Sequence, residues 1–423
     1  MDRKIIILKD PTSRPMPGSR TIRDAQASLL SNGWGSKNPE NDEFLMNSDK
    51  LLWHKERLLQ WARDPENASL VPLHIDMGVT TGCNLACTYC YGVIQARTGF
   101  QGKQGAMRFM SYETMNRFFS DCDSLGVKSI ALIGECENTL NPSMFQVLER
   151  ARDLKLEFSL ATHGASIKSG HMRTLLSSLT WLRVNISAGT KQGYMRVHQR
   201  PWFDRVIEST TSLLEIRDKE GILNKTGEKC TVGWQMVVDY NNFDEIIALS
   251  NLAREVGVDY LVIKACSDTP DGRLNAPSGE YVDAHNLFDE AEALSNDVTK
   301  IIARWEKLGN GGNKIYSKCF GTRFIIAVSG NGNVFPCGHW FDIEKDRFLM
   351  GNINERNFSE IVASDRYKKV QQEILGLDLR QCETNCRQHQ VNIRLENLYL
   401  DSNRVETIES SKTLTKPRHV NFI

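Results

Sequence analysis

Several common features are missing from this 423-residue chain, and each absence excludes a class of protein. The 52 basic and 52 acidic residues cancel, so electrostatics gives no reason to expect nucleic acid or an anionic membrane as a partner. No apolar run reaches the ~18 residues that a membrane-spanning helix needs. The beginning of the chain, MDRKIIILKD, has one apolar run, shorter than the ~7 residues of a secretory signal core. We therefore predict a cytoplasmic protein without a membrane or nucleic-acid partner.

Cysteine, by contrast, is abundant, with 11 residues in the chain. Because disulfides are rare in a reducing compartment, this number favours metal or redox chemistry over a disulfide framework. Three of the cysteines lie in one short stretch, TTGCNLACTYCYG, at Cys83, Cys87 and Cys90. A loop of this kind can wrap three thiols around one metal centre.

The length predicts two or three domains, and the residue pattern divides the chain into three stretches. Residues 1–74 form an N-terminal extension with a strand-like piece, KIIIL, and an amphipathic segment, SDKLLWHKERLLQWARD. Residues 75–300 alternate strand-like and helix-like segments. Residues 301–423 contain a hairpin pattern, RFIIAVSGNGNVFPCG, whose glycine-rich centre suits a turn, followed by a helical segment and more cysteines.

The central stretch predicts an α/β fold. It contains six strand candidates, namely LHIDMGVT, KSIALIG, FSLATH, WLRVNISAG, CTVGWQMVVD and VDYLVIKAC. Between them lie helical patterns, such as the one that places Met115, Phe118, Phe119 and Cys122 on one face. Six such units predict parallel strands joined by crossover helices, curled into an open barrel or arranged as a doubly wound sheet.

The three clustered cysteines follow the first of these strands, where active-site loops of parallel α/β folds lie. A structural zinc site normally has four nitrogen or sulfur ligands, and residues 75–100 hold no fourth cysteine or histidine. The nearest histidine, His74, belongs to the strand itself. Three thiolates on an iron–sulfur cluster leave one iron open, which is typical of a catalytic centre. Zinc binding and incidental clustering remain the alternatives.

The spacing C-x3-C-x2-C, with Tyr89 before the last cysteine, resembles the signature of radical S-adenosylmethionine (radical SAM) enzymes. The resemblance implies a 4Fe–4S cluster whose open iron is chelated by S-adenosylmethionine, and a reductant such as flavodoxin or ferredoxin. It also implies a 5′-deoxyadenosyl radical that takes a hydrogen atom from the substrate, and a partial (β/α)6 barrel over residues 75–300.

Further positions resemble the same family. The segment IGECENTLNP is similar to the family's G-x-G-E-P turn, which implies that Gly134 and Glu137 bind the amino group of the methionine moiety. The chain departs from that turn at Cys136, where glycine is usual, and at Asn138, where proline is usual. Ser187, at the end of the fourth strand, resembles a polar contact to the cofactor. The alternative for Ser187 is an ordinary hydroxyl at a strand end.

A second group of cysteines lies in the tail, at Cys319, Cys337, Cys382 and Cys386, with Gly332 in the hairpin between the first two. Four thiolates can bind either zinc or a fully ligated iron–sulfur cluster, and spacing alone does not separate the two. The pattern resembles the SPASM and twitch extensions of radical SAM enzymes. With no further cysteine after the last of these, the resemblance implies the shorter twitch form with one auxiliary 4Fe–4S cluster.

The remaining cysteines divide into two pairs. Cys122 and Cys230 fit structural positions in a helix face and at the start of a strand. Cys266, which closes the sixth strand, and Cys136 lie where a thiol could donate a hydrogen atom to a substrate radical, as in radical SAM epimerases. Small buried filler is the alternative interpretation for both.

The resemblance leaves several overall reactions open. An auxiliary cluster suits net oxidation of a small polar substrate, such as a sugar, a cyclitol or an aminoglycoside-like molecule. A nearby cysteine suits epimerisation, and maturation of a ribosomal peptide by cross-linking is a third possibility. A non-catalytic iron–sulfur or zinc scaffold is the alternative outside enzymes. We predict a dehydrogenase-like radical SAM oxidoreductase of natural-product biosynthesis.

Overall fold

The computed structural model describes residues 44, 50–95, 97–99, 105–277, 281, 284–308, 314–411 and 416–423. They all belong to one compact unit, Gly35–Ile423. The strand-like piece KIIIL of the N-terminal extension lies outside the described residues. The amphipathic segment after it is described, and most of it forms the helix α2, Lys55–Arg63.

A ten-stranded sheet runs through this unit in the order β12-β11-β10-β1-β4-β5-β6-β7-β8-β9. The six strands predicted from the sequence are confirmed as β1 (His74–Met77), β4 (Ser129–Leu132), β5 (Glu157–Thr162), β6 (Leu179–Asn185), β7 (Thr231–Val238) and β8 (Tyr260–Ala265). They are parallel to one another, as expected for crossover connections. A short further strand, β9 (Lys300–Ala303), extends the parallel sheet and was not predicted.

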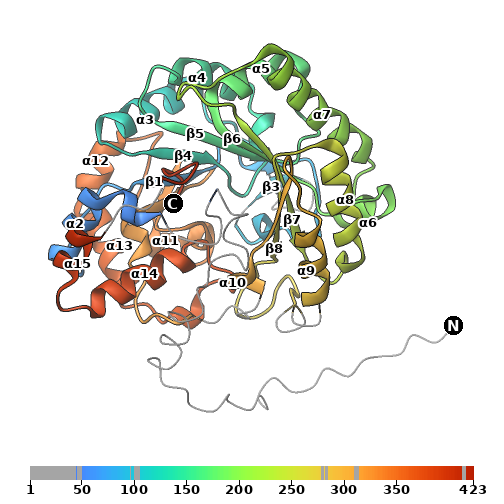
Figure 1. The fold of residues 1–423 in the computed structure, drawn as a ribbon. Helices are drawn as coiled ribbons and strands as arrows, with labels where there is room; N and C mark the ends of the chain where they lie inside the picture. The colour runs from blue at the N-terminus through green and yellow to red at the C-terminus, as the bar shows by residue number, and fades with distance from the viewer. Residues whose placement is uncertain are drawn as a thin grey trace. The chain divides into compact units, whose positions relative to one another are not determined.

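Helices cover the outer side of the curved parallel sheet (Figure 1). They are α3 (Tyr112–Ser124), α4 (Ser143–Ala151), α5 (Ser169–Ser178), α6 (Lys191–His198), α7 (Phe203–Glu220), α8 (Ile246–Val256) and α9 (His285–Ala293). The predicted apolar face of α3 is confirmed, since Met115, Phe118, Phe119 and Cys122 are all buried in the main core. Among the described residues, no helix is both long and apolar enough to span a bilayer.

The tail of the chain joins the same sheet. The predicted hairpin is confirmed as β10 (Ile325–Val328) and β11 (Asn333–Phe335), and its turn uses Gly332 at a φ of +86°. The strand β10 pairs in parallel with β1, so the sheet continues across the boundary expected near residue 300. The rest of the tail comprises β12 (Gly351–Asn352), α10 (Trp305–Leu308), α11 (Lys345–Phe348), α12 (Phe358–Ala363), α13 (Asp365–Leu375), α14 (His389–Leu400) and α15 (Arg404–Ser410).

The last residues of the chain close the floor of the barrel, where the parallel strands begin. Phe422 packs edge-on against Trp181 and His74, with ring centroids 5.5 and 5.7 Å apart. The hydroxyl of Ser129 donates a hydrogen bond of 2.5 Å to the carbonyl oxygen of Asn421. The amino ends of β1 and β6 are therefore covered by aromatic packing.

Candidate active site

The three clustered cysteines lie in the connection after β1, at the carboxyl end of the parallel strands. Cys83 ends the short strand β2 (Gly82–Cys83), and Cys90 directly precedes a 3-10 turn, Tyr91–Val93. The three thiols are close enough for each charge to act on the others. Burial raises the pKa of Cys83 to about 12, and burial together with the two neighbouring thiols raises the pKa of Cys87 well above its usual range. Such thiols form thiolates readily only when a metal compensates their charge.

Each of these sulfur atoms accepts one hydrogen bond from a different kind of donor. The backbone N–H of Leu85 donates to Sγ of Cys83 at 3.4 Å. The buried guanidinium of Arg97 donates to Sγ of Cys90 at 3.2 Å. Donors aimed at sulfur stabilise thiolates and raise the reduction potential of a cluster bound to them.

The donor to Cys87 is His198, at the end of α6, with 3.1 Å between Nδ1 and Sγ. Its other nitrogen, Nε2, accepts the backbone N–H of Ser187 at 3.0 Å. Nε2 is therefore unprotonated, and the ring proton lies on Nδ1 and points at the sulfur. Burial lowers the pKa of His198 to about 3, so the ring is neutral. His198 thus fixes this cysteine by a directional hydrogen bond and adds no charge.

The structure brings Tyr89 and Ser187 together, two residues that the sequence placed near the cofactor. The hydroxyl of Tyr89 accepts hydrogen bonds from Oγ of Ser187 at 2.9 Å and from Nδ2 of Asn185 at 2.6 Å. Oγ of Ser187 also accepts the backbone N–H of Val237 at 3.1 Å. Both side chains are buried, so they tie the cysteine loop to the ends of β6 and β7.

The turn after β4 contains Gly134, Cys136 and Glu137. Gly134 is exposed, and a Cβ there would lie 3.2 Å from Cα of Gly78 at the end of β1. The thiol of Cys136 donates to Oδ1 of Asn138 at 3.1 Å, so this side chain is directed into the turn. Cys136 is still close enough to the cysteine loop for the charge of Cys83 to raise its pKa, although burial is the main cause.

Glu137 is buried and held by several donors from its own chain. Oε1 accepts hydrogen bonds from the hydroxyls of Thr139 at 2.5 Å and Thr162 at 2.7 Å. Oε2 accepts the backbone N–H of His163 at 2.8 Å and has room for another donor. The carboxylate is thus fixed in place with one acceptor position left.

Glu135, next to these residues, links the turn to the tail hairpin. Oε1 accepts the backbone N–H of Gly330 at 2.8 Å, and Oε2 is buried without a partner among the described atoms. A Cβ on Gly330 would lie 1.7 Å from the carbonyl oxygen of Thr80, so only glycine allows this close approach. Burial raises the pKa of Glu135 to about 7.

Cys266 directly follows β8 and packs against the cysteine loop. Its thiol lies 3.8 Å from the carbonyl oxygen of Tyr89 and 3.4 Å from that of Ser267. The residue is only 1% exposed, in a small apolar group that includes Val197 and Val237. Burial raises the pKa of Cys266 to about 12, so the group is a neutral thiol that retains its hydrogen.

The four tail cysteines also come together. Cys319 precedes the 3-10 turn Gly321–Arg323, and Cys337 follows β11. Cys382 follows the 3-10 turn Leu379–Gln381, and Cys386 precedes α14. The other three thiols all act on the charge of Cys337, and burial raises its pKa well above the usual range.

Two of these tail sulfurs accept hydrogen bonds. Sγ of Cys319 accepts from Nδ2 of Asn392, and Sγ of Cys386 accepts from the backbone N–H of Gln388, each at 3.4 Å. Together with mutual proximity, such donors fit thiolate ligands. No three His, Cys, Asp or Glu groups among the described residues converge on a single-ion position. A 4Fe–4S cluster requires no such convergence, because each thiolate binds a different iron.

One histidine joins the two cysteine sites. His339, two residues after Cys337, is buried, and its Nδ1 lies 2.7 Å from the hydroxyl of Tyr91. Its Nε2 lies 3.0 Å from the carbonyl oxygen of Gln381. Because a carbonyl only accepts, Nε2 carries the proton and Nδ1 accepts from the tyrosine. Tyr91 follows Cys90 and Gln381 precedes Cys382, so a two-bond bridge connects the loops.

Family models match both parts of the chain. Residues 77–222 match the radical SAM superfamily, and residues 319–388 match the SPASM iron–sulfur cluster-binding domain. The chain therefore contains a radical SAM domain and a SPASM domain. The match implies a 4Fe–4S cluster with S-adenosylmethionine in the barrel and auxiliary iron–sulfur chemistry in the SPASM region, and the cysteine sites described above fit these groups.

Several named proteins resemble this radical SAM chain. An AdoMet-dependent heme synthase of Methanosarcina barkeri is 24% identical over 316 residues, which cover 69% of this chain and 82% of that protein. A probable GTP 3′,8-cyclase of Saccharolobus islandicus is 22% identical over 218 residues, or 51% of this chain and 64% of its own length. This chain therefore spans less than two thirds of that cyclase.

Among solved structures, SuiB of Streptococcus suis bound to S-adenosylmethionine superposes with a TM-score of 0.56 at 15% identity, covering 90% of this chain and 84% of that one. SuiB has also been solved with its precursor peptide SuiA, with a TM-score of 0.53 at 17% identity over 84% of this chain and 78% of that one. These likenesses show a shared fold.

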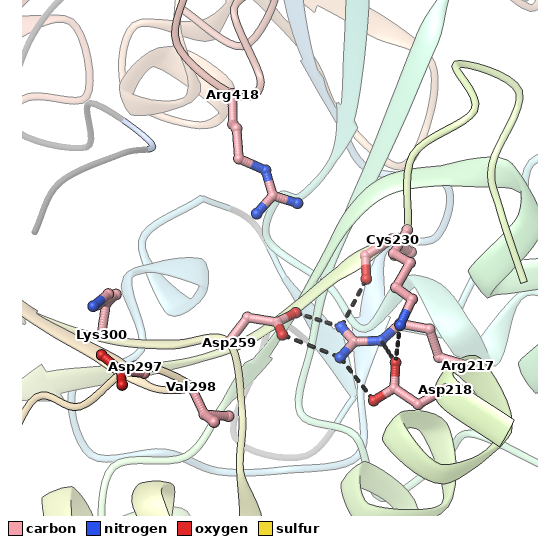
Figure 2. Close-up of a pocket in the computed structure, with 9 residues that line it drawn as sticks. Arg217, Asp218, Cys230, Asp259, Asp297, Val298, Lys300 and Arg418 are labelled. Carbon is pink, nitrogen blue, oxygen red and sulfur yellow. Dashed lines mark hydrogen bonds and ion pairs between the residues drawn. The ribbon is translucent and has the colours of Figure 1, made fainter. Parts of the chain in front are cut away.

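A separate pocket of about 370 Å³ lies at the opposite end of the strands, on the barrel floor. Figure 2 shows Arg217 held between Asp218 and Asp259, with 3.1 Å from Nη2 to Oδ1 of Asp259. Cys230 lies here, at the end away from the cysteine loop, as predicted for a structural cysteine. Arg217 in this pocket is already paired with two acids, and none of the clustered cysteines lines the pocket.

Proposed function

We propose that this radical SAM protein is an oxidoreductase that removes hydrogen from a small polar substrate. Cys83, Cys87 and Cys90 would bind the catalytic 4Fe–4S cluster, with S-adenosylmethionine at the open iron. When bound, these groups supply a 5′-deoxyadenosyl radical that takes a hydrogen atom from a C–H bond. The observation that carries the proposal is the loop itself: three mutually close thiols, each with its own hydrogen-bond donor.

The surrounding residues would orient the cofactor. Gly134 is exposed at the end of β4 and leaves the backbone open to the methionine moiety. Glu137, held by Thr162 and His163, has one acceptor position left on Oε2 for the amino group. Tyr89 and Ser187 are occupied with one another, so they would act by fixing the loop. The sequence-based role of these residues as cofactor contacts remains a prediction.

The tail site favours oxidation as the outcome. Cys319, Cys337, Cys382 and Cys386 are four thiols, so a 4Fe–4S cluster held by them has no open iron and can take up an electron but cannot ligate the substrate. A substrate that loses a hydrogen atom to the radical, then one electron to this site and one proton to solvent, ends with a C=O or C=N bond. The bridge through His339 keeps the two sites at a fixed separation.

Epimerisation is the second candidate, because Cys266 lies against Tyr89 of the cysteine loop. Its thiol could return a hydrogen atom to the substrate radical. Maturation of a peptide is a third candidate, supported by the fold shared with SuiB. An iron–sulfur scaffold without catalysis would use the same cysteines but would need no open iron.

The test is anaerobic reconstitution with iron and sulfide, followed by S-adenosylmethionine and dithionite. Formation of 5′-deoxyadenosine is expected, whereas its absence despite an intact cluster would indicate the scaffold. With a substrate in deuterated water, oxidation yields a product lighter by two hydrogens. Epimerisation through an exchangeable thiol yields a product of unchanged oxidation level with one deuterium on carbon.

A further inference from the structure

The inner face of the sheet carries a band of partly exposed side chains, although most other residues of these strands are buried. These are Asp76 on β1, Ala161 on β5, Arg183 and Asn185 on β6, Gln235 on β7 and Lys264 on β8. They lie on one face because Ala161 is paired with Arg183 and Asn185 with Gln235 across neighbouring strands. Nδ2 of Asn185 reaches the hydroxyl of Tyr89, so the band begins directly below the cysteine loop.

Arg183 is held in this band without a carboxylate. Nε donates to the hydroxyl of Tyr260 at 3.0 Å, and Nη1 donates to Oε1 of Gln235 at 3.1 Å. The guanidinium lies over the ring of Trp181, 4.6 Å from the centroid. A Cβ on Gly233 would lie 2.3 Å from the Tyr260 ring, so only glycine lets that ring lie flat across β7. Neutral groups thus orient the guanidinium, leave Nη2 unpartnered within the described chain and do not neutralise the charge.

Lys264 is the second cation, and its Nζ makes no hydrogen bond or ion pair with the described residues. It is paired across the sheet with Val237, which belongs to the same small apolar group as Tyr89. Burial is the main cause that lowers the pKa of Lys264 to about 8. The positive charges of Arg183 and Arg304 lower it further, and the negative charge of Glu383 opposes this shift only in part. A partly buried lysine beside two arginines is unfavourable unless an anion joins them.

The acid in the band, Asp76, is close enough for the charge of Arg183 to lower its pKa, but its oxygens are held by other groups. Oδ1 of Asp76 lies 2.9 Å from Nε2 of His74, and Oδ2 lies 3.4 Å from Nε of Arg387. Near the strand ends, Asp268 accepts the backbone N–H groups of Leu274 and Ala276 at 2.9 and 3.0 Å. These carboxylates are already bound within the chain.

We propose that Arg183 and Lys264 bind an oxyanion of the substrate, either a carboxylate or a phosphate ester. This inference rests on the proposed function, since it places the substrate below the cysteine loop, and it narrows the substrate class. An acidic or phosphorylated small molecule fits the two cations, whereas a polycationic aminoglycoside would be repelled by them. Arg183 presents its guanidinium edge to the oxyanion, and Lys264 adds a point charge.

The test is equilibrium binding of four probes that share one ring, namely D-glucose, D-glucosamine, D-glucuronate and D-glucose 6-phosphate. The reconstituted full chain is used with saturating S-adenosylmethionine and no reductant, so the cofactor's own carboxylate site is filled and no turnover occurs. We expect at least one anionic probe to bind about tenfold more tightly than glucose, and glucosamine to bind most weakly. The carboxylate and phosphate arms distinguish the two sources of the oxyanion. Equal affinity for all four probes would overturn the proposal.

Single-residue variants test whether the preference for anionic probes comes from the band of inner-face side chains. Lys264→Met removes the charge without breaking a hydrogen bond and should abolish most of the anion preference. Lys300→Met makes the same change in the floor pocket of Figure 2, at the other end of the strands, and should leave the preference intact. Arg183→Gln should weaken the anionic probes, and Arg183→Lys should partly retain them even if the glutamine variant folds poorly. Equal losses in Lys264→Met and Lys300→Met would contradict a local site.

The two proposals fail separately. If the protein prefers anions through Lys264 but forms no 5′-deoxyadenosine under reducing conditions, the proposed function is wrong and the proposed anion site is supported. If the protein forms 5′-deoxyadenosine but shows no preference for anions, the anion site is wrong and the proposed function is supported.

Discussion

The two cysteine sites are built in opposite ways. Cys83, Cys87 and Cys90 come from one loop of eight residues, whereas the four tail cysteines come from a hairpin and a turn far apart in the chain. The loop site can be organised by its own sequence together with His198 and Arg97. The tail site depends on segments that the sheet brings together, since Cys319 precedes β10 and Cys337 follows β11.

The difference in thiol number separates the chemistry as well. Three thiolates leave an iron for a cofactor, and four thiolates close the cluster. In this chain, therefore, the cysteines that lie close together in the sequence would leave one iron of their cluster open. The cysteines that lie far apart in the sequence would ligate every iron of theirs. Four changes to the chain test this contrast between the two sites, and the one with the largest expected effect comes first.

Replacing Cys83, Cys87 and Cys90 with alanine should abolish cleavage of S-adenosylmethionine altogether. If both sites hold 4Fe–4S clusters, iron should fall from about eight to about four atoms per chain. Iron analysis and assay of 5′-deoxyadenosine check both effects. Cys122→Ala, the same change in the core of α3, serves as the control and should keep both. Full iron content in the triple variant would show that the loop is not the cluster site.

Cys382→Ala should produce the complementary result. The tail site loses one of its four ligands, so about half of the iron should be lost or become labile. Cleavage of S-adenosylmethionine should persist, because the loop site is unchanged. Electron paramagnetic resonance of the reduced protein should lose one of two cluster signals. Zinc in the tail site, with no second cluster signal in the wild type, would remove the basis for an electron-accepting role.

Glu135→Gln tests the contact that joins the two sites through Gly330. Because burial raises the pKa of Glu135 to about 7, the folded state binds this proton more tightly than the unfolded chain, whose glutamate titrates near 4.3. The stability that Glu135 contributes is complete below about pH 4 and is lost as the pH rises through about 7. Glutamine resembles the protonated acid and does not titrate.

The free energy of unfolding of Glu135→Gln should therefore rise relative to that of the wild type by about 2 kcal/mol between about pH 5.5 and about pH 8.5, because only the wild type loses stability over this range. Thermal unfolding at the two pH values measures it. A difference between the two proteins that stays constant with pH would mean that the carboxyl group is solvated in the folded protein.

Cys266→Ala should have the smallest effect. If the enzyme oxidises its substrate, the variant should lose about 1 kcal/mol of packing and nothing else. Cleavage of S-adenosylmethionine and product formation should match the wild type. Accumulation of 5′-deoxyadenosine without product, together with deuterium in the wild-type product, would instead favour epimerisation.

Local patterns in the sequence predicted much of the fold. The strands β5 and β6 are runs of apolar and β-branched residues, and the face of α3 repeats at helical spacing, so both were recognisable. The strand β9 is only four residues long and was missed. Pairing of β10 with β1 was also missed, because register between distant segments leaves no local signal. Phe422, a single aromatic in a polar tail, gave no sign that it fills the barrel floor.

In the candidate site too, features with a local sequence pattern were predicted, and features that depend on distant contacts were missed. Spacing alone singled out the clustered cysteines as candidate ligands, and the structure brings the thiols of each group together. The donors to their sulfurs, His198 and Arg97, are ordinary residues until the fold brings them near. Arg183 and Lys264 lie in strands that are mostly buried, and a charged residue inside such a strand was the available signal. The bridge from His339 to Tyr91 depends on tertiary structure and left no signal in the sequence.

The parallel pairing of β10 with β1 affects how the chain is made. The strand β1 is synthesised early, but its partner on one side appears only after the whole barrel has left the ribosome. During that interval, β1 presents unpaired backbone groups along one edge, which can pair with another nascent chain. Contacts between such distant segments also slow folding. Chaperone co-expression and low temperature should therefore improve the yield of soluble protein, and removal of residues 301–423 should produce aggregates instead of an independent barrel.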